Sequence, residues 1–197
     1  PTFGPGHLWV FPRGVGQAGR RMSNLEFCER SVWGVLQQPA NTLSACAFFG
    51  TAAFVWKAGG HHAWTMALLG LCTAAMHATG APWAGIADLA SMFLCVTYSL
   101  CKNCGFAERA AVPAAAACSR LSVASVHVRG LAVFTAVAAA WLLSYIPVLS
   151  LRVVCGYAVF SVAFLAWFVD RQESACDPYS PWQWHALWHV GSAVGFA

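Results

Sequence analysis

The feature that most constrains this chain is a run of apolar segments, almost free of charge, that follow one another from about residue 39 to the last residue. Hydrophobic residues make up 59% of the sequence and charged residues only 9%, whereas a soluble domain averages about 25% charged residues. Since the deficit extends along the chain, we expect most of the surface to face lipid rather than water. The composition therefore predicts a single polytopic membrane domain.

Seven segments are apolar over about the length of a transmembrane helix, which needs roughly 20 residues. They are Pro39–Trp56, His62–His77, Trp83–Leu100, Ala110–Val126, Leu131–Ile146, Leu149–Phe168 and Trp182–Phe196. The fourth is the least regular, because it is rich in alanine and contains Pro113 and Arg120. We predict an all-α fold, a seven-transmembrane-helix bundle over residues 31–197. A polar tail over residues 1–30 precedes it, without a cleavable signal peptide.

The charge pattern bears on partners and on orientation. The net charge is +4 and the sequence contains no basic run, which argues against nucleic acid and for anionic lipid headgroups as partners. We call the side of the bilayer that holds the N-terminal tail the tail side. Its basic residues outnumber those of the opposite side, and they are Arg13, Arg20, Arg21, Arg30, Arg120, Arg129 and Arg171. The positive-inside rule then favours a cytoplasmic tail side.

Histidines mark the ends of two segments. His185 and His189 are four residues apart, so both imidazoles lie on one helix face and can reach one metal ion. His77 ends the second segment, and Asp88 lies in the first turns of the third. With seven spans, even-numbered spans end and odd-numbered spans begin on the tail side, so all four residues are expected at one depth. With six spans His185 would face the opposite leaflet, so the site depends on the fourth span.

This combination fits a catalytic zinc site. Three histidines and a water are a recurring ligand set, and zinc lowers the pKa of its water to about 7. A nearby carboxylate, here Asp88, can accept the proton and pass it to a leaving group. Thr73 is one turn before His77, so its hydroxyl points the same way and can bond the water or an oxyanion. We predict His77, His185 and His189 as zinc ligands, and Asp88 and Thr73 as catalytic residues.

Each of these residues also has a purely structural interpretation. A single transmembrane histidine usually bonds another helix. Asp88 alone fits a carboxylate stabilised at a helix N-terminus, and Thr73 alone fits a hydroxyl bonded to its own backbone. Their combination at one depth favours the metal site. His61 and His62 begin the second segment on the opposite side and are interpreted as interfacial.

Several short anchors extend from about residue 27 to residue 192. They are Phe27-Cys28-Glu29, Asn41-Thr42-Leu43-Ser44, Thr73, His77, Asp88 and His185-Ala186-Leu187-Trp188-His189. Together they resemble the alkaline ceramidase family, within a superfamily that includes the progestin and adipoQ receptors and the Per1 group. The resemblance implies a seven-helix hydrolase in which three histidines hold zinc and an aspartate assists the water. It also implies cleavage of ceramide to a fatty acid and a sphingoid base.

The sequence departs from the family pattern at two places. Thr73 stands where the family has a serine, which keeps the hydroxyl and adds a methyl group. The family has a calcium site around a Trp-Cys-Glu segment that resembles Phe27-Cys28-Glu29, completed by an acid where this chain has Gln38. Arg30 also intrudes there, so we do not expect that calcium site.

Some alternatives stay open at the level of the sequence. Cys28 and Cys176 both flank spans on the tail side, so a disulfide between them is geometrically possible and would need an oxidising compartment there. Besides a ceramidase-like hydrolase, the residues fit a seven-helix lipid receptor or regulator with a structural zinc, a Per1-like ester lipid hydrolase, or a scaffold. We favour the zinc-dependent hydrolase, an integral multi-pass membrane protein that takes ceramide or a related N-acyl lipid from the bilayer.

Overall fold

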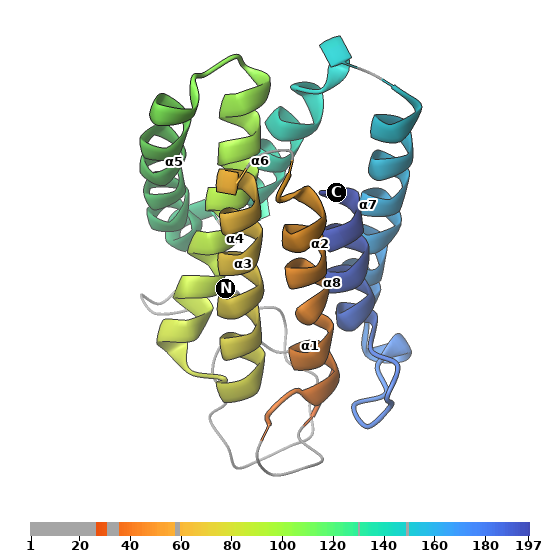
Figure 1. Cartoon of the computed structure of the whole chain (residues 1–197). Helices are drawn as coiled ribbons and strands as arrows, with labels where there is room; N and C mark the ends of the chain where they lie inside the picture. The colour runs from red at the N-terminus through yellow and green to blue at the C-terminus, as the bar shows by residue number, and fades with distance from the viewer. Residues whose placement is uncertain (1–26, 31–35, 58–59, 130, 149) are drawn as a thin grey trace.

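The computed structural model describes residues 27–30, 36–57, 60–129, 131–148 and 150–197 (Figure 1). Within these ranges all regular structure is helical, which confirms the predicted all-α fold class. The helices are α1 (Pro39–Ser44), α2 (Cys46–Val55), α3 (Gly60–Thr79), α4 (Pro82–Asn103), α5 (Glu108–Arg129), α6 (Leu131–Leu143), α7 (Leu151–Val169) and α8 (Trp184–Gly195), with 3-10 turns at Ile146–Val148 and Glu173–Ala175. Most of the predicted tail, residues 1–26, lies outside the described residues.

The first predicted span is divided into α1 and α2, so the seven predicted segments correspond to eight helices. The division falls at Ala45, whose backbone stays in the right-handed helical region with φ −60° and ψ −21°. Just before it, the Ser44 hydroxyl donates to the carbonyl oxygen of Asn41 at 2.9 Å, a back-bond that often bends a helix. The other six segments each form one main helix, with ends that differ from the prediction by a few residues.

The irregular fourth segment is helical, as predicted, and its alanines explain why. The small side chains of Ala111 and Ala115 are fully buried, which lets α5 approach α4 closely. Two hydroxyls join the helices: Thr97 donates to the carbonyl oxygen of Ala115 at 3.1 Å, and Ser119 donates to that of Ala90 at 2.7 Å. Close packing and inter-helix hydrogen bonds therefore stabilise α5, whose small side chains bury less apolar surface than those of the other helices would.

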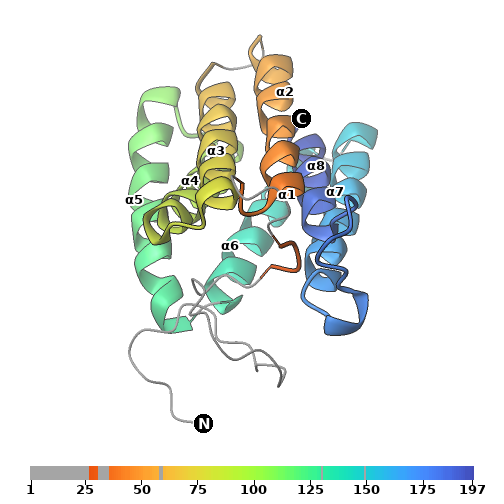
Figure 2. The same cartoon turned by 90° about the horizontal axis from the view of Figure 1, so that it is seen from below.

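The remaining contacts bring the end of α3 next to the start of α8. In both views α1 and α2 lie between α3 and α8 (Figures 1 and 2). The segment before α1 bonds to the last turn of α3, since the N–H of Gln38 donates to the carbonyl oxygen of His77 at 3.0 Å. Helix α8 lies tightly against α7: a Cβ on Gly191 would be 2.6 Å from that of Ala163, so glycine is needed for this approach.

Two of the described helices, α4 and α7, are both long enough and apolar enough to cross a bilayer, with mean hydropathies of 1.5 and 1.8. Helices α6 and α8 have 13 and 12 residues, fewer than the roughly 20 that a full span needs. The seven-helix bundle in a membrane is therefore an interpretation that we take up under the proposed function.

A disulfide joins the described part of the tail to the loop before α8. Cys28 and Cys176 are bonded across 148 residues of sequence, with their Cα atoms 5.4 Å apart. Beside it, the N–H of Arg30 donates to the carbonyl oxygen of Pro178 at 2.9 Å. The sequence left this pairing open, and the structure shows it. We call residues 27–30 the strap, because the disulfide and the main-chain hydrogen bond of Arg30 hold this short segment next to the histidines.

Candidate metal centre

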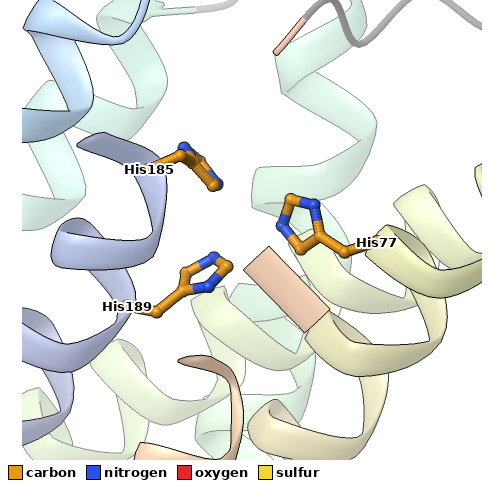
Figure 3. Close-up of side chains that lie close together, drawn as sticks. All are labelled: His77, His185 and His189. Carbon is orange, nitrogen blue, oxygen red and sulfur yellow. The ribbon is translucent and has the colours of Figure 1, made fainter. Parts of the chain in front are cut away.

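The three predicted histidine ligands come together. His77 is in the last turn of α3, and His185 and His189 are in the first two turns of α8. One ligand nitrogen from each can be chosen so that all three lie within 4.8 Å of one another. Figure 3 shows the rings gathered around a common space, with centroid separations of 4.6 to 5.0 Å. All three side chains are buried, so this group can hold a metal ion.

Neighbouring groups fix two of the rings through their Nδ1 atoms. The amide oxygen of Gln38 lies 2.5 Å from Nδ1 of His77. Nδ1 of His189 lies 2.8 Å from the Ser44 hydroxyl and 3.1 Å from the carbonyl oxygen of Asn41. A carbonyl oxygen accepts, so each Nδ1 carries the proton and each Nε2 keeps a free lone pair. Such partners are typical of metal-ligating histidines.

Unsatisfied nitrogen atoms support a metal at this point. Among the described residues, Nε2 of His77 and Nδ1 of His185 are buried without a hydrogen-bond partner. A buried polar atom without a partner costs free energy, and a metal ion would remove that cost. Three imidazoles suit zinc, and also copper, iron or nickel. The residues therefore fit a metal, as predicted for His77, His185 and His189.

Asp88 and Thr73 lie in the cavity that borders the histidines. Both line it together with His185 and His189, and the Thr73 hydroxyl donates to Oδ1 of Asp88 at 2.5 Å. Asp88 does not belong to the group of close ligand atoms. The sequence predicts that four residues lie together. In the structure the three histidines form one close group, and Asp88 lies in the adjoining cavity. Because the Thr73 hydroxyl donates its hydrogen bond to Asp88, it holds that carboxylate in place.

The cavity is mostly apolar. It extends from the histidines between α3, α4, α6, α7 and α8, and its walls include Leu69, Met92, Val96, Val137, Trp141, Phe160 and Phe196. The polar side chains on its wall are few and include Thr73, Asp88, Arg171, His185, His189 and Ser192. An apolar cavity with a small polar end suits a ligand with a long hydrocarbon part and one polar group.

The strap lies against the three histidines, which the sequence did not predict. The ring centroid of Phe27 lies 4.1 Å from that of His185 and 5.0 Å from that of His77. Asp170 connects the strap to α8, because its carboxylate accepts from the N–H of Cys28 at 3.4 Å and of His185 at 3.2 Å. Burial raises the pKa of Asp170 above its ordinary value, and these two hydrogen bonds oppose the shift.

Glu29 and Gln38, which the resemblance links to a calcium site, have other partners here. The buried carboxylate of Glu29 accepts from the N–H groups of Ala40 and Asn41 at 2.6 and 2.9 Å, and so caps α1. Burial raises its pKa, while the two hydrogen bonds lower it. Gln38 bonds His77 instead. The only signal for Gln38 in the sequence was its departure from the family pattern.

No protein-family model matches this sequence, and no curated protein sequence matches it.

Proposed function

We propose that this protein is a zinc-dependent membrane hydrolase that cleaves the amide bond of ceramide or a related N-acyl lipid. The observation that carries the proposal is the buried group of three histidines at the polar end of an apolar cavity, with Asp88 on the same wall. A structural metal would need neither the cavity nor the carboxylate. The anchor residues of the alkaline ceramidases support the same reading.

The outer surface supports a seven-helix bundle in a bilayer. Large apolar side chains are exposed along α7, where Leu151, Val162 and Leu165 are 80%, 67% and 62% exposed. In water such a surface would be an aggregation hazard, whereas in lipid it is the expected one.

The residues of this cavity can carry out an amide hydrolysis. Zinc, when bound by the three imidazoles, supplies a water that ionises near neutral pH and a Lewis acid for the carbonyl oxygen. Asp88 can hold the proton from that water and return it to the amine nitrogen that leaves. Thr73 keeps Asp88 in one orientation. The apolar walls bind the acyl chain and exclude water, and Phe27 covers the histidines from the strap side.

The disulfide bears on orientation. Disulfides persist in oxidising compartments, so we propose that the tail side faces the lumen or the exterior, against the arginine distribution. An engineered N-glycosylation site near Tyr179, which is 66% exposed in the same loop, would be modified in a eukaryotic host. Modification only of a site near Lys57, at the opposite end of the bundle, would contradict this orientation.

The decisive experiment is hydrolysis of a fluorescent ceramide by the purified protein in detergent, before chelation, after chelation and after zinc is added back. We expect activity that chelation removes and zinc restores. Cleavage of an ester analogue without cleavage of the amide would favour the Per1-like alternative. One zinc per chain without turnover of either lipid would favour the receptor, and no bound metal would favour a scaffold.

A further inference from the structure

The apolar part of the cavity wall carries a polar group that the proposed hydrolysis does not use, the indole N–H of Trp141. Trp141 is in α6 and lines the cavity together with Val137 and Ala138. Val137 and Trp141 are one helical turn apart, so this is the face that α6 presents to the cavity. Trp141 is 2% exposed, and its Nε1 has no hydrogen-bond partner among the described residues.

The neighbours of this indole are aromatic rings. The ring centroid of Trp141 lies 4.8 Å from that of Phe196, 5.1 Å from that of Phe160 and 5.7 Å from that of Tyr145. A ring face is only a weak acceptor for an N–H group, and a buried tryptophan usually finds a stronger one. A buried donor without an oxygen partner costs free energy. The indole N–H is therefore a donor that an oxygen atom of a ligand in the cavity can use.

Trp141 lies some way along the cavity from the metal centre. Phe196, whose ring it contacts, comes seven residues after His189 at the end of α8, which is about 10 Å along the helix axis. An extended chain advances about 3.6 Å over three bonds. A lipid whose amide lies at the histidines would thus reach the indole with the middle of a hydrocarbon chain, roughly eight bonds away.

We infer that Trp141 is a specificity-determining residue, which binds an oxygen atom carried in the middle of a hydrocarbon chain of the lipid. The inference rests on the proposed function and narrows its substrate class. A keto oxygen suits the place best, because it accepts from the indole without adding a donor that itself needs a partner. Either the acyl chain or the chain on the amine side can carry this oxygen, and the indole recognises both in the same way.

The test compares three N-acyl lipids: one with unsubstituted chains, one with a keto group in the middle of the acyl chain, and one with it in the middle of the amine-side chain. The full chain, loaded with zinc, should show the highest kcat/KM for one of the keto lipids, which identifies the chain. Trp141→Phe keeps an aromatic ring and removes the N–H. The ratio of kcat/KM for that keto lipid to kcat/KM for the unsubstituted lipid should then fall by about two- to tenfold, the usual effect of one uncharged hydrogen bond.

The ratio separates recognition from packing, because lost ring volume lowers kcat/KM for every lipid and leaves the ratio unchanged. Trp64→Phe is the matched control. Trp64 makes the same chemical change possible in α3, but it is 63% exposed and does not line the cavity, so the ratio should stay as in the wild type. Thermal unfolding shows whether each variant is folded.

The outcomes separate the subsite from the proposed function. Equal kcat/KM values for all three lipids in the wild type would overturn the subsite, and so would a preference that folded Trp141→Phe retains. If the wild type hydrolyses none of the lipids, the proposed function fails by itself. In that case, or if Trp141→Phe is misfolded, the indole N–H resonances of the wild type are recorded by NMR with an unsubstituted fatty acid and with its mid-chain keto analogue. One indole resonance that moves only with the keto acid supports the subsite, and identical spectra refute it.

Discussion

The two ends of helix α3 carry histidines and face a carboxylate on a neighbouring helix, but they differ in their surroundings. At one end, His77 is buried, and Gln38 fixes its ring. At the other, the side chain of His61 is 59% exposed, and its Nδ1 lies 3.0 Å from Glu108, which also pairs with Lys102 at 2.7 Å. The comparison teaches that residue types do not make a metal site. What distinguishes the buried end is burial of all three rings and the partners that hold the rings of His77 and His189 in one tautomer.

The largest effect should come from removing a ligand at the buried end. His185→Ala leaves two imidazoles, so the purified protein should lose its metal and essentially all ceramide hydrolysis. Metal content per chain and turnover are the measurements. His61→Ala at the exposed end is the control, and it should keep both. Stoichiometric metal in His185→Ala would refute the assignment of this centre.

Removing the carboxylate without removing a ligand separates binding from chemistry. Asp88→Asn keeps the shape and can still accept from Thr73, but it cannot hold a proton as a base. We expect metal content to stay at the wild-type level and kcat to fall by about 10²–10⁴-fold. Glu108→Gln makes the same chemical change at the exposed end and should leave kcat unchanged. Full turnover by Asp88→Asn would end the role of Asp88 as a base.

The arrangement of ligands was predictable because it follows from local rules. The spacing of His185 and His189 fixes one helix face, and the number of segments places His77 at the same end. The contacts of Gln38, Phe27 and Asp170 were not predictable. They depend on how the start of α1, the strap and the end of α7 pack against other helices. Sequence spacing carries no information on such packing.

The division of the first span was also beyond the sequence. Pro39 and the apolar residues that follow predict a single helix, whereas the structure divides it at Ala45, next to the place where the Ser44 hydroxyl bonds back to the carbonyl oxygen of Asn41. The same serine then contacts Nδ1 of His189. The place where the prediction differs from the structure therefore lies beside the histidine group, and Ser44 supplies a hydroxyl to the ring of His189.

A smaller effect should come from loosening one ring. Gln38→Leu removes the acceptor of the Nδ1–H of His77, so the ring loses its fixed tautomer and the affinity for zinc should fall by about 10–100-fold. A competition titration against a chelator measures this. Gln37→Leu is the neighbouring control, because Gln37 is exposed. Equal affinities in wild type and Gln38→Leu would show that the contact does not support the metal.

The smallest effect belongs to the exposed end. Lys102→Ala removes one of the partners of Glu108, but both side chains are more than a third exposed, at 40% and 37%, so water and salt screen the pair. Exposed pairs contribute about 0.2–1 kcal/mol, and we expect a change in the free energy of unfolding within that range, smaller still at high salt. Metal affinity and turnover should not change. If Lys102→Ala reduced zinc binding as much as Gln38→Leu, the two ends of α3 would be coupled, and burial alone would not explain why only one of them can hold a metal.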